Sequence, residues 1–227
     1  KNMDGHFKIA TAIGALEVNF KSRDEITVTL GAPKLSASQI PFVHNSGKIE
    51  RVVKEKFRLN DIEFPITCVN VGNPHCVIFE ADFLKPHLFN SINTRISQDN
   101  FFPASLISIA EALEVDSRFP EHTNIEFVNV VNRRHIQVFV WERGSKATLA
   151  CGSAAAAAVV ASILEGKTDH IVDVTLPGGT LAIDWSDKNA IKMTGSANLS
   201  FHGQIDVSVE KLMINKSAGS SPRVKVS

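Results

Sequence analysis

The sequence lacks the features that mark several large classes of protein. Its 24 basic and 24 acidic residues give a formal net charge of +0, so no excess charge favours a nucleic acid or a membrane surface as a partner. Its three cysteines have no regular spacing, which argues against a disulfide framework or a zinc site and fits a reducing cytosol. We find no signal peptide and no apolar run long enough to span a bilayer. The composition predicts a cytoplasmic protein without nucleic-acid or membrane partners.

The most informative stretch covers residues 141–153 and reads WERGSKATLACGS. The preceding residues, His135–Trp141, alternate between two faces as a strand does. One face of this strand would carry Ile136, Val138 and Val140, and the other Gln137, Phe139 and Trp141. The following residues, Ser153–Leu164, are all small or aliphatic, and Glu165 and Gly166 close the run. The pattern predicts a strand, a loop and an enclosed helix, with Cys151 at or just before the helix N-terminus.

The position of Cys151 suggests chemistry. The first backbone N–H groups of a helix have no partner inside it, and the helix dipole leaves partial positive charge there. We therefore expect the pKa of the Cys151 thiol to lie well below about 8.5, and the N–H groups of Gly152 and Ser153 to be able to hold a carboxylate. A lone cysteine is equally often a small buried core residue, but the adjacent Glu142-Arg143-Gly144 turn favours function.

Alternating and helical patterns predict most of the remaining elements. Strands are expected at Phe7–Ala12, Gly14–Phe20, Glu25–Leu30, Ile171–Leu176, Leu181–Trp185 and Ile191–Thr194, with two more inside Ile66–Phe79. Helices are expected at Leu84–Asn90 and Ala104–Leu113, and a hairpin turn at Pro177–Gly179. Less regular predictions are a strand pair or short amphipathic piece at Lys48–Arg58, a strand at Leu199–Val209 and a flexible tail over residues 213–227. Cys68 and Cys76 lie in apolar runs and are interpreted as core residues.

The motif around Cys151 resembles the second-half signature of diaminopimelate epimerase, an amino-acid epimerase that uses no cofactor. Five further segments resemble that family in the same order along the chain. They are Leu30–Pro33, Val71–Val77 with its Gly-Asn-Pro-His sequence, Phe119–Phe127 with Phe-Pro and Thr-Asn, and the pair Leu176–Gly179 and Met193–Gly195. The resemblance runs from about Ile9 to about Val207, and the combination of motifs is specific.

The resemblance implies a mixed α/β fold with two pseudo-symmetric lobes, each a curved, mostly antiparallel sheet around a central helix. Residues 1–42 and 197–212 would belong to the N-terminal lobe, and residues 43–196 would form the C-terminal lobe. The Cys-Gly-Asn motif of the family's first half is absent from this sequence. The first lobe is therefore expected to be incomplete, and the chain alone, with one catalytic thiol, is expected to be inactive.

The implied reaction converts LL-diaminopimelate to meso-diaminopimelate with two cysteines, one acting as base and the other as acid. By resemblance Cys151 is one of the two, and His75 lies near the reacting carbon. Glu142 would tune the thiol or meet an ammonium group. The substrate-binding residues implied by the family are Asn73, Asn124, Glu142, Arg143, Gly152 and Ser153. No metal and no cofactor are implied, diaminopimelate is the expected partner, and a homodimer is kept open.

Three positions depart from the family pattern. Lys146 and Ala147 stand where the family usually has glycine and glutamate, and Ala154 stands where it usually has glycine. Lys146 would either lower the pKa of the thiol or point to water, and the usual exposure of lysine favours the second. Two alternatives stay open: an inactive relative that binds an amino-acid-like ligand, and a two-thiol racemase of the proline or hydroxyproline type. Arg143 argues against the racemase, because it implies a second substrate carboxylate.

Overall fold

A computed structural model of the protein describes residues 5–11, 14–44, 47, 49–82 and 101–203. Residues of the range 1–196 belong to one unit and those of 197–227 to another. The part of the second unit that the structure describes, residues 197–203, has no regular secondary structure. The predicted helix at Leu84–Asn90, the tail over 213–227 and most of the predicted strand at Leu199–Val209 lie outside the described residues, and the described portion of that strand is irregular.

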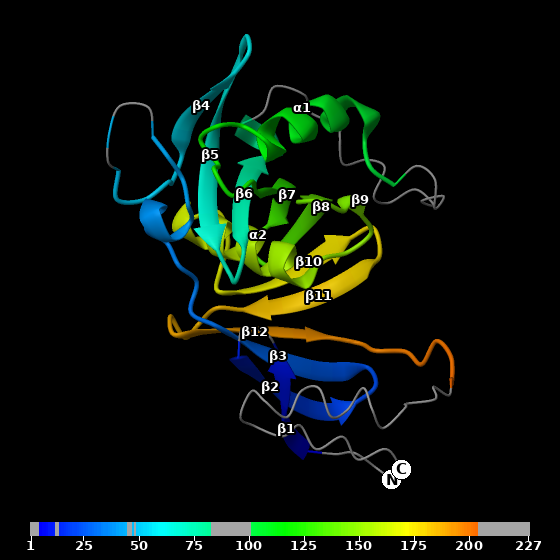
Figure 1. The fold of residues 1–227 in the computed structure, drawn as a ribbon. Coiled ribbons are helices and arrows are strands. Elements are labelled where there is room, and N and C mark those ends of the chain that lie inside the picture. Colours follow the sequence, from blue (N-terminus) through cyan, green and yellow to red (C-terminus); the bar gives the residue numbers. More distant parts are fainter. Residues whose placement is uncertain (1–4, 12–13, 45–46, 48, 83–100, 204–227) are drawn as a thin grey trace, which may run out of the picture. The chain divides into compact units, whose positions relative to one another are not determined.

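The described residues form twelve strands and two α-helices, a mixed α/β arrangement rich in sheet (Figure 1). The strands are β1 (Gly5–Thr11), β2 (Gly14–Ser22), β3 (Glu25–Gly31), β4 (Glu55–Leu59), β5 (Ile62–Asn70), β6 (Pro74–Phe79), β7 (Asn124–Asn132), β8 (His135–Glu142), β9 (Lys146–Thr148), β10 (Ile171–Leu176), β11 (Gly179–Asp184) and β12 (Ala190–Gly195). The helices are α1 (Ala104–Glu114) and α2 (Gly152–Leu164), with short 3-10 turns at Ala37–Gln39 and Glu80–Asp82.

All twelve strands belong to one sheet in the order β1-β2-β3-β12-β11-β10-β8-β7-β6-β5-β4, and β9 pairs with β8. Most pairs are antiparallel, but β6 runs parallel to β7 and β8 runs parallel to β10. The β6–β7 register sets His75 beside Asn124 and Val77 beside Glu126. This register brings together residues that lie about 50 positions apart in the sequence.

Helix α2 is enclosed by the sheet. It contacts β5, β6, β7, β8, β10, β11 and β12, and every residue from Ala154 to Ala161 is fully buried. In Figure 1, α2 lies between the strands β6–β8 and the strands β10–β11. Strands that approach a helix from several sides leave little room for side chains, which explains the run of alanine and valine. The prediction of a helix over Ser153–Leu164 is confirmed, with one more residue at its start.

Two hydrophobic cores lie on opposite faces of β8. Ile136, Val138 and Val140 pack with α2, whereas Phe139 and Trp141 pack with α1. The core between β8 and α1 is rich in aromatic rings. Its Phe102 contacts the rings of Phe127, Phe139 and Trp141 at centroid distances of 6.2, 5.9 and 5.7 Å. The alternation predicted for residues 135–141 is therefore confirmed, because each of its two faces is buried against a different helix.

Most other predicted elements are confirmed with small changes at their ends, including the hairpin turn between β10 and β11. The prediction that Lys48–Arg58 forms a strand pair or a short amphipathic segment is wrong. The strand β4 covers Glu55–Leu59, and its partner is β5, which lies outside the predicted range. The three-residue strand β9 was not predicted, because so short a run carries no alternation. Cys68 and Cys76 are buried cross-strand neighbours, as expected of core residues.

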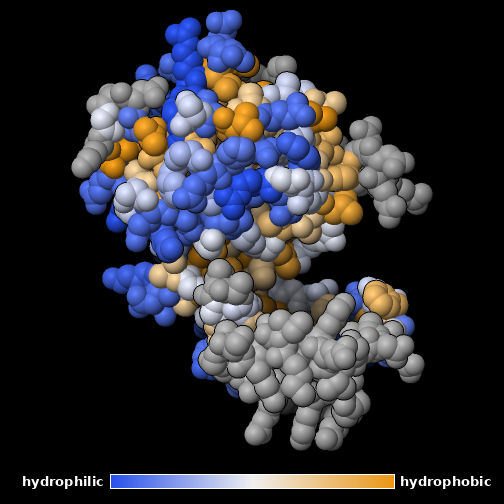
Figure 2. Space-filling view, viewed as in Figure 1, coloured by the Kyte–Doolittle hydropathy of each residue, from blue (hydrophilic) through white to orange (hydrophobic). Residues whose placement is uncertain are grey.

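Figure 2 shows one face of the molecule. In its upper part, which contains β4–β11, hydrophilic residues cover much of the surface and hydrophobic residues form small groups among them. Within the described residues no helix has the length and apolar character needed to cross a membrane.

Candidate active site

The site is built on the segment that joins β8, β9 and α2. Cys151 occupies the position just before the helix, with extended backbone angles (φ −145°, ψ 120°), and its carbonyl oxygen accepts a hydrogen bond from the N–H of Ala155. This is the geometry of a helix N-cap. Of the three cysteines, Cys151 alone is partly exposed, whereas the other two are buried. The predicted placement of the thiol at the helix N-terminus is confirmed.

The electrostatic surroundings of Cys151 differ from the prediction. Burial raises the pKa of its thiol above the ordinary value, and the nearby Glu142 and Glu126 carboxylates raise it further. The Ser153 hydroxyl, 3.3 Å from the sulfur, and the N–H of Ala154 act in the opposite direction but do not prevail. The expectation of a lowered pKa was wrong, because the helix N-terminus is buried among carboxylates. Burial in this structure therefore favours the neutral thiol form of Cys151.

The loop before Cys151 is held by the β10–β11 turn. The N–H of Gly178 donates to the carbonyl oxygen of Leu149 at 2.7 Å. A Cβ atom on Gly178 would lie 3.1 Å from that same oxygen, so a side chain there would push the loop away. On the other side, a Cβ on Gly152 would lie 2.7 Å from the sulfur of Met193. Both glycines therefore serve close packing around the start of α2.

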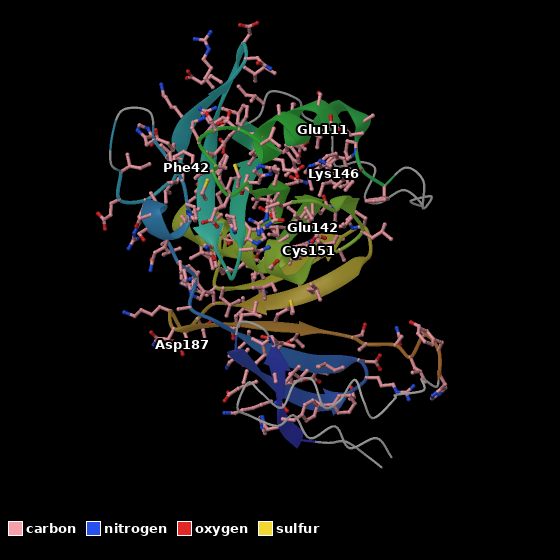
Figure 3. All side chains as sticks on the ribbon, in the orientation of Figure 1. Phe42, Glu111, Glu142, Lys146, Cys151 and Asp187 are labelled. Carbon is pink, nitrogen blue, oxygen red and sulfur yellow. The ribbon has the colours of Figure 1, made fainter. Side chains whose placement is uncertain are left out.

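Glu142 and Arg143 end β8 and begin the turn to β9. The Thr148 hydroxyl donates to Glu142 at 2.6 Å, which orients this half-buried carboxylate. The backbone N–H of Arg143 donates to the Asn124 side-chain oxygen at 2.9 Å, and its exposed guanidinium donates to the carbonyl oxygen of Glu121 at 2.6 Å. Figure 3 shows Glu142 and Cys151 next to each other beneath α1.

Asn124 joins two loops of the site. Its side-chain N–H donates to the carbonyl oxygen of Pro74 at 2.8 Å, while its oxygen accepts from Arg143. The side chain is buried, and both of its polar ends are bound to backbone. In this structure Asn124 supports the site, and its predicted contact with substrate stays a prediction.

His75 forms a buried pair with Glu126, a residue that sequence reasoning missed. The His75 Nδ1 lies 2.6 Å from a Glu126 oxygen, its Nε2 lies 2.9 Å from the Asn73 side-chain oxygen, and both members of the pair are fully buried. Burial raises the pKa of Glu126, and His75 opposes that shift. The available signal was a glutamate among the apolar residues of β7, at a position that alternation assigns to a buried face.

Lys146 is tied to a second buried carboxylate, at the end of α1. Its ammonium lies 2.9 Å from Glu114 and 5.4 Å from the centre of the Trp141 ring. The expectation that Lys146 is exposed to water is borne out, because its side chain is 53% exposed, but its ammonium is also paired with Glu114, which was not expected. Lys146 also does not lower the pKa of Cys151, whose neighbouring charges are those of Glu142 and Glu126.

A cavity of about 600 Å³ adjoins these groups. It is lined on one side by residues of β2, β3 and the following loop, and on the other by Val71–Asn73 and Ser153. Asn73 and Ser153 therefore line the same space, and their contact with a substrate stays a prediction. Gly152 and Cys151 adjoin it through Ser153, while the Arg143 guanidinium is directed to Glu121 at the surface. Among the described residues no cluster of three His, Cys, Asp or Glu side chains is arranged to bind a metal ion.

Comparison with known proteins identifies the family of the chain. Residues 67–200 match the family model described as diaminopimelate epimerase. A chloroplastic diaminopimelate epimerase of Oryza sativa subsp. japonica is 39% identical over 206 residues, which are 89% of this chain and 55% of the rice protein. The diaminopimelate epimerase of Geobacillus thermodenitrificans is 38% identical over 200 residues, or 86% of this chain and 62% of the bacterial protein. The chain thus spans a little over half the length of these relatives.

Solved structures show the same fold at low sequence identity. A probable proline racemase from Agrobacterium radiobacter has a TM-score of 0.61 and 14% identity, with 92% of this chain and 62% of that chain covered. A hydroxyproline epimerase from Agrobacterium vitis has a TM-score of 0.58 and 12% identity, with 86% and 57% covered. At these identities the likeness concerns the fold.

Proposed function

The chain belongs to the diaminopimelate epimerase family, and we propose that it supplies one catalytic half of an enzyme that interconverts LL- and meso-diaminopimelate without a cofactor. The observation that carries the proposal is the partly exposed Cys151 at the N-terminus of α2, adjoined by Glu142 and the His75–Glu126 pair. The coarser function, an isomerase of the amino-acid epimerase type, follows from the family.

The geometry supports a role for each end of the substrate. Epimerisation removes the α-proton on one side of the carbon and returns a proton on the other, so two acid–base groups must face each other. Because burial raises its pKa, Cys151 suits the protonated member of such a pair. The N–H groups at the start of α2 would hold the α-carboxylate and stabilise the charge that develops there. Arg143 would bind the distant carboxylate, for which a planar guanidinium is well matched.

The second thiol has no candidate among the cysteines of this chain, since Cys68 and Cys76 are buried in the core. We propose that it comes from a first lobe that carries the family's Cys-Gly-Asn motif and continues the sheet at β1–β3. In this proposal residues 43–196 form the second of two similar lobes, and residues 1–42 with 197–212 belong to the first. A homodimer stays a separate proposal.

Exchange of the α-proton with solvent tests the function. A protein containing this chain together with a first lobe is incubated in deuterium oxide with LL- or meso-diaminopimelate. We expect deuterium at the α-carbon from either stereoisomer, and loss of that exchange in Cys151→Ala. Absence of exchange with both stereoisomers in the parent protein would sink the proposal.

A binding protein without catalysis is the second candidate, because Lys146 takes part in an ion pair where the family usually has glycine. Calorimetry with diaminopimelate separates the two functions. Binding that survives Cys151→Ala, together with no proton exchange in the parent, would favour the binder. The proline and hydroxyproline enzymes share the fold, but Arg143 continues to favour a substrate with two carboxylates.

The cellular location is also a proposal. The rice relative is named chloroplastic, whereas the name of the Geobacillus relative gives no compartment. We propose a reducing compartment, with the cytoplasm as first choice, because Cys68, Cys76 and Cys151 are all free thiols. Imaging of the tagged protein in its source cells checks this.

A further inference from the structure

We propose that Glu114 is a positioning residue for substrate binding: it fixes the backbone of the turn that follows Glu142 and carries Arg143, and the Lys146 ammonium completes its set of three hydrogen-bond donors. This inference rests on the proposed function. It assigns a role to the last residue of α1, which lies outside the motifs that resemble the family, and to the lysine that departs from the family pattern.

The Glu114 carboxylate accepts three hydrogen bonds from one hairpin. Trp141 donates its indole N–H at 2.8 Å, Gly144 its backbone N–H at 3.1 Å, and Lys146 its ammonium at 2.9 Å. The Gly144 bond uses one carboxylate oxygen and the other two bonds use the second. The residue is 4% exposed, so these protein donors replace water around the charge.

The three donors surround the residues to be positioned. Glu142 and Lys146 are paired across the β8–β9 ladder, and Arg143, Gly144 and Ser145 form the turn between them. Glu114 thus binds the hairpin before, within and after the turn. The Asn124 side-chain oxygen also accepts a hydrogen bond from the backbone N–H of Arg143. The backbone of the turn is therefore fixed while the Arg143 guanidinium stays exposed.

Lys146 has an unusual backbone for a lysine. Its φ of 65° lies in the left-handed region that favours glycine, the residue the family usually has here. A glycine would adopt this backbone without strain but would bring no charge. Lys146 is the charged group that lowers the pKa of Glu114, against the effect of burial and together with the Trp141 and Gly144 hydrogen bonds. At this strained backbone position, Lys146 therefore places its ammonium next to the buried Glu114 carboxylate.

The support of the thiol is separate. Cys151 follows a loop that is held by Gly178, and the thiol contacts Ser153 rather than any member of the Glu114 group. The Glu142 carboxylate, which acts on the pKa of Cys151, is itself oriented by the Thr148 hydroxyl and not by Glu114. Loss of Glu114 should therefore weaken the binding of the distant carboxylate through Arg143 and leave the reactivity of Cys151 nearly unchanged. A general structural role would change both.

The decisive variant is Glu114→Gln, because the amide keeps the shape but replaces one of the two acceptor oxygens by an NH2 donor, which must then face either the Gly144 N–H or the Trp141 and Lys146 donors. Glu111→Gln is the matched control: Glu111 lies one turn earlier on α1 and is exposed (Figure 3). Hydrogen–deuterium exchange is measured on the peptide that covers residues 141–146. We expect exchange at least about tenfold faster in Glu114→Gln and unchanged in Glu111→Gln. Lys146→Gly keeps two of the three hydrogen bonds and should give an intermediate rate of hydrogen exchange. This variant provides the test if Glu114→Gln does not fold.

Kinetics test the consequence for substrate. In the protein with both lobes, Glu114→Gln should raise the KM for diaminopimelate about tenfold and leave kcat within about threefold, with the rate of Cys151 alkylation unchanged. Unchanged hydrogen exchange at 141–146, or a fall in Cys151 alkylation parallel to the rise in KM, would overturn the positioning role. A parent protein that neither binds nor epimerises diaminopimelate would instead refute the proposed function, and the hydrogen-exchange result would then decide alone whether Glu114 anchors the turn.

Discussion

The two helices each bring one end to the site, and they do so by different means. Helix α2 is enclosed by strands, its residues from Ala154 to Ala161 are fully buried, and its backbone N-terminus supplies the position of Cys151. Helix α1 covers one face of the sheet with a buried stripe that includes Leu106, Ala110 and Leu113, and it contributes a side chain, Glu114, at its end. The enclosed helix thus contributes its backbone N-terminus to the site, whereas the covering helix contributes a side chain.

The largest effect is expected from removing the Cys151 thiol at the start of α2. Cys151→Ala should lower α-proton exchange in the two-lobe protein by roughly 10²–10⁴-fold, the usual contribution of a general acid or base. The change is small and lies at a partly exposed position, so the unfolding midpoint should move little. Proton exchange followed by NMR, with denaturant unfolding as the control for folding, measures both; wild-type exchange in this variant would remove Cys151 from the mechanism.

Helix α1 should be sensitive to the loss of volume. Leu106→Ala removes a fully buried side chain of the aromatic core and should destabilise the protein by about 2–5 kcal/mol. Its neighbour Ile107 is 37% exposed, and Ile107→Gln should change stability by no more than about 0.5 kcal/mol. Urea unfolding of the two variants provides the comparison, and equal effects would contradict the assignment of the buried stripe.

Helix α2 should be sensitive to the opposite change. Ala157 is fully buried among strands, so Ala157→Leu adds volume to a site without space and should cost about 1–3 kcal/mol. The equivalent test on the covering helix is a substitution of the exposed Glu111 by leucine, which should be close to neutral. If α2 tolerates the leucine without loss in the unfolding midpoint, it is less tightly enclosed than described.

The smallest expected effect concerns the pH dependence of the α1 anchor. The pKa of Glu114 is lowered from 4.5 in the folded state, so its ionised form stabilises the protein above about that pH, and the contribution is lost as the pH falls through the lower folded-state pKa. Lys146→Met removes the cation while burial still raises the pKa, so the variant should lose stability at a higher pH than the parent. Near neutral pH its cost should be about 1 kcal/mol, because the exposed part of Lys146 is screened by solvent.

Urea midpoints across the acidic range measure this difference. Superimposable pH profiles for the parent and Lys146→Met would show that the ion pair does not couple to folding.

The sequence predicted the enclosed helix and both faces of β8 because their patterns are local. Uninterrupted small residues are compatible with a helix that strands surround, and alternation assigns each β8 side chain to a face. The Gly-rich turn at residues 177–179 was equally local. The structure places the charge of Glu142 near Cys151 and pairs His75 with Glu126, and the roles that the family resemblance implies for these residues stay predictions.

The errors concern contacts between distant segments. Glu114 and Lys146 are 32 positions apart, and Glu126 meets His75 across 51 positions, so neither pairing leaves a periodic signal. The pKa of Cys151 was predicted from the helix terminus alone, whereas burial and two carboxylates from other strands decide its direction. Charges brought together by the sheet register cannot be inferred from local spacing.

The most direct test of the account is the pH dependence of alkylation at each cysteine of this chain. With iodoacetamide and mass spectrometry, Cys151 should be labelled in preference to the buried Cys68 and Cys76, and its rate should reach half its maximum at a pH above that of an unperturbed cysteine peptide. Comparable labelling of all three cysteines in the folded protein, or a Cys151 midpoint below that value, would contradict a single accessible thiol that burial keeps protonated.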